Sequence, residues 1–171
     1  MSCLAVADQG LRLEFSFADL MRYHGPGSPG GVAHAYKVLE RALPLLAPDD
    51  APERREVAVR TAFGGPGARD AFELVLRAVT GERYTVDLAL ARPDRGRAAE
   101  RFVFALTYRD REVTLALRGG FVTDEFVDLA RAPQRTPEQE ARLTTLKAEM
   151  AERVMAAPPD AVYLAETSPG A

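Results

Sequence analysis

The chain has 171 residues, of which 47% are hydrophobic, 27% charged and 8% aromatic, a composition that excludes a disordered or low-complexity protein. Its 22 lysines and arginines nearly balance 25 aspartates and glutamates, so a formal net charge of −3 gives no general attraction to nucleic acid or anionic lipid. We therefore expect one domain over residues 1–171, with neither nucleic-acid nor membrane partners.

The sequence carries no sign of export or membrane insertion. The longest apolar runs, such as residues 42–47, fall well short of the roughly 20 residues that a transmembrane helix needs. Residues 1–17 alternate charged and apolar side chains and do not resemble a signal peptide. A single cysteine, Cys3, can form neither an internal disulfide nor a cysteine metal cage. These features favour a cytoplasmic protein.

Regular spacing of apolar residues predicts the elements of the first half. Apolar residues at intervals of three and four predict a helix over 31–46, which Pro48 ends. Alternation of apolar and polar residues predicts a strand over 57–63. A second helix is predicted over 68–80, after the break at 64–67, with Gly81 at its C-terminal cap.

Strands dominate the next stretch. Apolar residues with a period of two predict strands over 84–90, 102–108 and 113–117, with a loop at 91–96. The short connector 109–111 predicts that the last two strands form an antiparallel hairpin. The basic residues Arg54-Arg55 and Arg109 with Arg111 are interrupted by acids and indicate solvated faces.

Two helices are predicted at the C-terminal end. Thr123 provides an N-cap for a short helix, and Thr136, Pro137 and Gln139 provide an N-cap, a proline at N1 and a capping box for a longer one. Pro158 and Pro159 end this helix, and the tail 166–171 is expected to fray.

This order of elements predicts an α+β fold. We expect an α-β-α-β-β-β core, with a mixed or antiparallel sheet covered by helices and a helical extension over residues 122–157. The sequence argues against a dinucleotide-binding fold, because the βαβ repeat and a glycine-rich turn with its distant acidic partner are both missing.

Glycine and proline make up six of the eight residues from His24 to Gly31, directly before the first predicted helix. Such a loop allows a ligand to approach the backbone, and a helix N-terminus attracts anions. A second loop, 64–67, also leads into a helix. If the two helices lie side by side, both N-termini border one cleft; ordinary tight turns would have the same composition. The predicted ligand-binding residues are Gly25, Gly27, Ser28, Gly30, Gly65 and Gly67.

His24 is the candidate catalytic residue, because it flanks the loop and because an imidazole serves both metal ligation and proton transfer near neutral pH. His34 lies in the first turn of the next helix, where a packed histidine is the simpler interpretation. Asp70 and Glu73 lie one turn apart on the second helix. They are either ligands or complements to the helix dipole.

Two segments resemble motifs of the FmdE family, whose members are accessory components of formylmethanofuran dehydrogenase. Residues 17–25 with Ser28-Pro29-Gly30 resemble its opening motif: Asp-Leu, an aromatic residue, His-Gly-His-x-Cys-Pro-Gly and a helix. Residues 67–73 with Thr80-Gly81 resemble its second motif, Cys-x-x-Asp-Ala-x-Gln followed by Thr-Gly. The resemblance covers residues 15–118 and implies the same core. It also implies an accessory or binding role beside a molybdenum or tungsten enzyme of one-carbon metabolism.

The chain departs from the family at chemically important positions. Pro26 replaces the second motif histidine, Ser28 and Gly67 replace the two cysteines, and a helix stands where some members carry a zinc ribbon. Thiolate ligation and thiol chemistry are therefore excluded at these positions. Two occupants remain: a divalent metal ion such as zinc, held by His24, Asp70 and His34 or Glu73, or a small anion at the two helix ends.

Three functions follow as hypotheses. The first is a homodimeric accessory protein that binds a metal or a small ligand in a cleft at His24 and Asp70. The second is a small hydrolase- or lyase-type enzyme, in which His24 is the general acid or base and Asp70 orients it. The third is an interaction module without a ligand, whose loops shape a partner surface.

Overall fold

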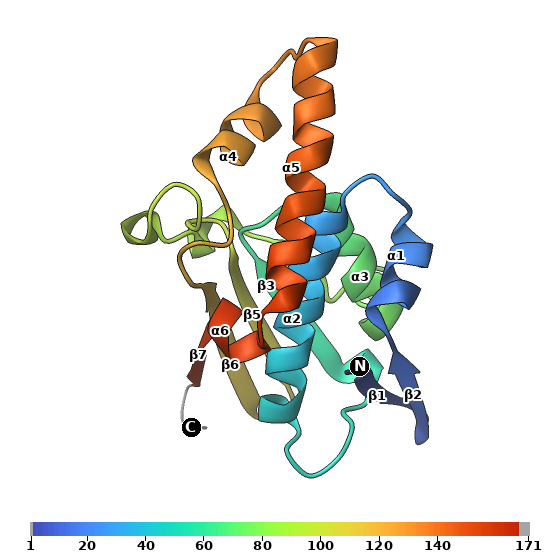
Figure 1. The fold of residues 1–171 in the computed structure, drawn as a ribbon. Coiled ribbons are helices and arrows are strands. Elements are labelled where there is room, and N and C mark those ends of the chain that lie inside the picture. Colours follow the sequence, from blue (N-terminus) through green and yellow to red (C-terminus); the bar gives the residue numbers. More distant parts are fainter. Residues whose placement is uncertain (1, 168–171) are drawn as a thin grey trace.

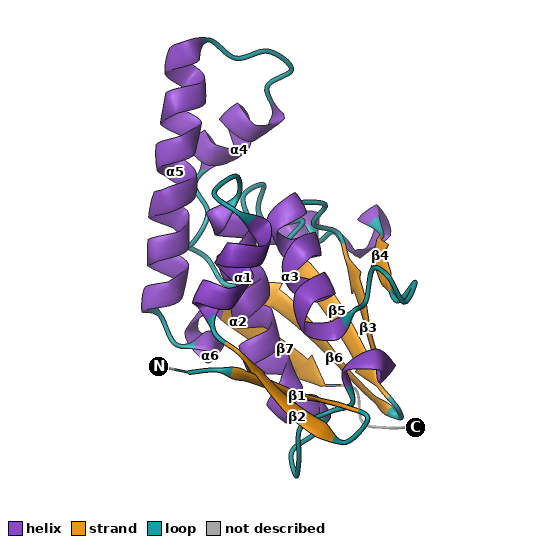
Figure 2. Ribbon diagram, turned by 90° about the vertical axis from the view of Figure 1, so that its right-hand side faces the viewer, coloured by secondary structure: helices purple, strands orange, loops and turns teal. Residues whose placement is uncertain are grey.

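The computed structural model describes residues 2–167, in which helices cover one face of a five-stranded sheet (Figures 1 and 2). The elements are β1 (Leu4–Asp8), β2 (Leu11–Phe15), α1 (Phe17–His24), α2 (Pro29–Leu46), β3 (Val57–Thr61), α3 (Pro66–Leu76), β4 (Tyr84–Val86), β5 (Val103–Tyr108), β6 (Arg111–Leu117), α4 (Asp124–Arg131), α5 (Pro137–Ala156), α6 (Pro159–Val162) and β7 (Tyr163–Thr167). The α+β class is confirmed. Within residues 2–167, none of the helices has both the length and the apolar character needed to cross a membrane.

The main sheet has the strand order β4-β3-β5-β6-β7. β3 and β4 are parallel, whereas the other neighbours are antiparallel. The predicted hairpin of β5 and β6 is confirmed, with Tyr108 opposite Arg111. At the far edge β7 pairs with β6, which places Leu117 opposite Tyr163. Figure 1 shows α4 and much of α5, which lie between these two strands in sequence, extending beyond the sheet.

Several local predictions are confirmed. The first predicted helix is α2, which begins two residues early at Pro29 and ends at Leu46. Thr123 caps α4 by accepting a hydrogen bond from Phe126 N. Thr136 and Gln139 form the capping box of α5, since each side chain accepts a hydrogen bond from the other residue's backbone N–H, at 3.2 and 2.9 Å.

Other boundaries were predicted wrongly. The strand predicted over 84–90 ends at Val86, because Asp87 accepts a hydrogen bond from Ala89 N and starts a 3₁₀ turn. The predicted loop 91–96 contains another such turn, Pro93–Arg95. Glu166 and Thr167 were expected to fray but belong to β7, while residues 168–171 lie outside the described residues. The hairpin of β1 with β2, helix α1 and strand β7 were not predicted.

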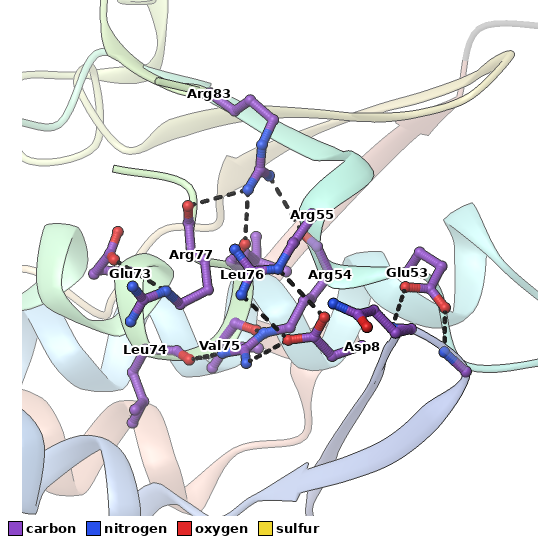
Figure 3. Close-up of polar contacts among 12 residues, drawn as sticks. Asp8, Glu53, Arg54, Arg55, Glu73, Leu74, Val75, Leu76, Arg77 and Arg83 are labelled. Carbon is purple, nitrogen blue, oxygen red and sulfur yellow. Dashed lines mark hydrogen bonds and ion pairs between the residues drawn. The ribbon is translucent and has the colours of Figure 1, made fainter. Parts of the chain in front are cut away.

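The second predicted helix also ends earlier than expected, and two arginines explain why (Figure 3). It ends at Leu76, and Arg77, rather than Gly81, occupies the C-cap in the left-handed region at φ 55°. Arg54 and Arg83 donate hydrogen bonds to four successive carbonyl oxygens at this end, those of Leu74, Val75, Leu76 and Arg77. Guanidinium groups at a helix C-terminus satisfy the last carbonyls and complement the helix dipole.

Arg54 is therefore not part of a solvated face, because it is buried and extends this network to the β1–β2 hairpin (Figure 3). Its Nη1 lies 3.4 Å from a carboxylate oxygen of Asp8, which also pairs with Arg55. Beside it, Glu53 accepts hydrogen bonds from the backbone N–H groups of Gln9 and Gly10, at 3.1 and 2.9 Å. The hairpin is thus held to the end of α3 that is remote from the glycine loops.

At their N-termini, α2 and α3 are in contact through backbone atoms. A Cβ on Gly67 would lie 2.5 Å from the carbonyl oxygen of Ser28 and 2.9 Å from Val32 N, closer than Cβ atoms approach other atoms in folded proteins. On the facing helix, a Cβ on Gly31 would lie 3.2 Å from Ala68 N. The absence of a side chain at Gly67 therefore sets how closely the two helix N-termini approach.

We expect Gly67→Ala to lower the free energy of unfolding by about 2 kcal/mol, since overpacking a rigid contact costs about 1–3 kcal/mol. Gly64→Ala is the matched control: its Cβ would meet nothing closer than Val86 Cγ1 at 3.8 Å, so the change should stay within about 0.5 kcal/mol. Urea denaturation of both variants checks this. Equal losses would contradict a tight contact at Gly67.

Candidate functional site

The structure brings His24 and Asp70 together. His24 is the last residue of α1, and Asp70 lies in the second turn of α3. The His24 Nδ1 atom lies 2.7 Å from Asp70 Oδ2, and because a carboxylate accepts, Nδ1 donates. The His24 side chain is only 8% exposed, and its Nε2 atom is buried without a hydrogen-bond partner among the described residues. The pair has the geometry with which a carboxylate orients an imidazole.

His34 lies elsewhere, in the core. It is fully buried, its Nδ1 atom shares a 2.8 Å hydrogen bond with the Tyr163 hydroxyl, and its ring packs 4.6 Å from that of Phe102. Burial lowers the pKa of His34 to about 3, so the ring is neutral at physiological pH. The predicted metal ligands His24, Asp70 and His34 are thus not assembled at one point.

Glu73, the alternative ligand, is also engaged. Its carboxylate accepts hydrogen bonds from the hydroxyl and from the backbone N–H of Thr80, the latter at 2.8 Å. Burial opposes the charged form, but these hydrogen bonds outweigh it and lower the pKa of Glu73. Its role in the structure is to hold the turn after α3.

Within residues 2–167, no three histidine, cysteine, aspartate or glutamate side chains gather where they could hold a metal ion. The two positions that match the family's cysteines are Ser28 and Gly67, and Gly67 has no room for a side chain. Binding of zinc or another divalent ion stays a prediction.

A cavity of about 430 Å³ lies at the N-termini of α2 and α3. Of the predicted ligand-binding residues, Ser28, Gly30, Gly65 and Gly67 line it, whereas Gly25 and Gly27 do not, and neither do His24 and Asp70. Helices α4 and α5 and the segment before β5 supply further walls. The remaining lining residues are Gly31, Phe63, Gly64, Pro66, Arg97, Ala98, Arg101, Phe102, Phe126, Val127, Ala130, Arg131, Arg135, Leu143 and Lys147.

The charged residues among this lining all have one sign: it contains four arginines and one lysine, and no carboxylate among the described residues. Three cations pair with acids outside the lining, namely Arg97 with Asp128, Arg131 with Glu100 and Arg135 with Glu140. The exposed Arg101 side chain forms no hydrogen bond or ion pair with the described residues, and Lys147 donates only to the carbonyl oxygen of Gly27, at 3.2 Å. Two positive charges therefore remain without a carboxylate partner.

Two other hollows of similar size differ in charge. One of about 420 Å³ and one of about 440 Å³ both include Asp49 and Asp50, alongside arginines. The cavity at the helix N-termini is set apart from these two by the sign of its lining and not by its volume.

The N-termini that border the cavity also differ from those of the other long helices. Helices α1, α4 and α5 have a side chain that caps the first turn and acidic residues within it. The first turns of α2 and α3 contain no acidic residue, Ser28 makes no capping hydrogen bond, and Gly65 has no side chain to make one. These first-turn N–H groups therefore lack the side-chain acceptors and negative charge found at the other helices.

The sequence did not point to the basic and aromatic residues of the cavity. Arg101, Phe126 and Lys147 come from three segments that are separate in the chain, so no local pattern groups them. The only local signal was the pair of glycine- and proline-rich loops, which marks the floor of the cavity but not its walls.

No protein-family model matches the chain, and no curated protein is significantly similar to it. The resemblance to the FmdE family stays a prediction from the two motifs.

The His24–Asp70 hydrogen bond joins α1 to α3, so its two members should contribute to stability jointly. We expect a double-mutant cycle with His24→Ala and Asp70→Ala to give a coupling free energy of about 1 kcal/mol, because a hydrogen bond to a charged group that is partly exposed contributes about that much. Urea unfolding of the four proteins measures it. Additive single losses would show that the bond stabilises nothing.

Buried His34 should make stability depend on pH. The unfolded chain takes up a proton near the ordinary histidine pKa of about 6.5, whereas the folded protein resists protonation until about pH 3. Stability from this group is complete above pH 6.5 and falls as the pH falls below it. From pH 7 to pH 5 the loss should be about 2 kcal/mol.

The variant His34→Asn removes the titrating ring but keeps an acceptor for the Tyr163 hydroxyl. Between pH 7 and pH 5, the loss of unfolding free energy should be about 2 kcal/mol smaller for this variant than for the wild type. Parallel pH profiles for the two proteins would contradict a neutral, buried His34.

Proposed function

We propose that the protein binds a small anion in the cavity at the N-termini of α2 and α3. The observation that carries this proposal is the lining, in which five cationic side chains occur with no carboxylate among the described residues. Three of these cations pair with carboxylates outside the lining, so Arg101 and Lys147 are the charges that a bound anion would balance.

The two helix ends support the same conclusion. The first-turn N–H groups of α2 and α3 lack side-chain caps and acidic neighbours, and the helix dipoles add partial positive charge there. Glycine at positions 30, 31, 65 and 67 keeps the backbone free of side chains at this point. Backbone donors, Arg101 and Lys147 therefore border the same space.

The proposed binding site is therefore the cavity, and not the cleft at His24 and Asp70 that the sequence predicted. His24 is the residue directly before the glycine- and proline-rich loop, and its hydrogen bond with Asp70 ties that loop to α3. We assign the pair a positioning role. Acid–base catalysis by His24 and an interaction module without a ligand stay predictions, and the buried Nε2 atom favours neither of them.

A binding role agrees with the accessory role that the resemblance to the FmdE family implies. A cytoplasmic location and a homodimer belong to the same proposal. Both rest on the sequence alone.

Inorganic phosphate is the simplest probe of the site. We expect isothermal titration calorimetry at constant ionic strength to show saturable binding of phosphate by the wild type. Arg101→Gln should weaken the affinity about tenfold, because a charge-assisted hydrogen bond is worth about 1.5–3 kcal/mol. Lys147→Gln should act in the same direction.

Arg111→Gln is the matched control, because Arg111 opens β6 at the end of the hairpin remote from Arg101 and does not line the cavity. This variant should bind phosphate as the wild type does. The absence of saturable binding, or an equal loss in all three variants, would refute the proposal.

A further inference from the structure

The size of the cavity points to more than an inorganic ion. Pockets for organic ligands have volumes of about 300–1,000 Å³, and this cavity, at about 430 Å³, falls within that range. A phosphate ion bound at the helix ends would leave much of the space to water. That space has apolar walls, which include Phe63, Phe102 and Phe126.

The aromatic surface lies directly beside the helix ends. The Phe63 and Phe102 rings stack with centroids 4.4 Å apart and planes 23° apart. A Cβ on Gly65 would collide with Cζ of Phe63, so this ring lies against the backbone of the N-cap residue of α3. A ligand with its anionic group at the α3 N-terminus would therefore bring an attached ring to Phe63.

The two lining cations without a carboxylate partner among the described residues would be balanced by a ligand with two negative charges. These cations are Arg101 and Lys147, and Arg101 adjoins Phe102 in the chain. A phosphate monoester carries a charge of about −1.5 to −2 at pH 7 and has three acceptor oxygens. A carboxylate carries only half of the charge that the two cations would balance.

We propose, building on the anion-binding function above, that the ligand is an aromatic phosphate monoester. Its phosphate occupies the end of the cavity formed by the helix N-termini, Arg101 and Lys147. Its ring packs on the phenylalanines, of which Phe63 and Phe126 are half-buried and Phe102 is buried.

Phenyl phosphate, inorganic phosphate, benzoate and phenol separate the two parts of this ligand. By calorimetry at constant ionic strength, phenyl phosphate should bind the wild type at least about tenfold more tightly than inorganic phosphate, because burying the ring removes apolar surface from water. Benzoate and phenol should each bind more weakly than phenyl phosphate.

Two variants test which residue binds the ring of the ligand and which binds its phosphate group. Phe126→Ala should remove most of the preference for phenyl phosphate over phosphate while leaving phosphate affinity within about twofold, and this unchanged affinity also shows that the variant is folded. Arg101→Gln should weaken both ligands about tenfold. Arg111→Gln should change neither.

The outcomes distinguish the two proposals. Equal affinities for phosphate and phenyl phosphate, or a preference that survives in Phe126→Ala, overturn the aromatic ligand and leave anion binding standing. Benzoate binding as tightly as phenyl phosphate overturns the phosphate monoester in the same way. Phenol binding as tightly as phenyl phosphate likewise overturns the phosphate monoester, and the absence of binding of any probe overturns both proposals.

Discussion

The contact between Gly67 and the first turn of α2 determines how the rest of the site is arranged. A side chain at position 67 would meet backbone atoms of Ser28 and Val32 at distances that packed atoms do not adopt. Without one, α3 starts against the start of α2, and the ends of both helices open onto the same space. Asp70, on the same helix as Gly67, pairs with His24 of α1.

Cationic side chains occur near both ends of α3, but their relation to the helix dipole differs between the two ends. At the C-terminus of α3, Arg54 and Arg83 meet the negative end of the helix dipole and satisfy its last carbonyls. At the N-terminus, cations line the same cavity as the positive end of the dipole, which does not attract them. The first placement of arginine stabilises the fold, and the second agrees with the anion-binding function proposed above.

The sequence predicted those elements whose signals are local. The apolar spacing of α2, the capping box of α5 and the short turn between β5 and β6 each lie within a few residues, and all three were confirmed. The end of α3 could not be predicted in this way, because two arginines from outside the helix terminate it (Figure 3). Strand β7 was missed for a similar reason, since its pairing with β6 depends on residues about 50 positions away.

The candidate site likewise contains residues that the local sequence predicted and residues that it did not. Its glycine-rich floor was recognisable because conformational freedom and close approach require particular residue types in sequence. Its walls were not, since Arg101, Phe126 and Lys147 have no local relation to one another and meet only through the tertiary fold. For His34 the sequence favoured a packed histidine over a ligand, and its buried ring, hydrogen-bonded to Tyr163, agrees with that interpretation.

The pairing of Leu117 with Tyr163 also bears on which segment of the chain can vary while the order of the strands stays the same. These residues are direct neighbours across β6 and β7, so everything between them, including α4 and α5, is an excursion whose two ends meet. Its outer part can change in length without altering the order of the strands, whereas Met150 and Val154 of α5 are fixed by their packing in the core. Phe126 and Lys147 belong to this excursion, while Gly31 and Gly67 do not. In the proposed site, the walls on the excursion can therefore change while the glycine contact beneath them is retained.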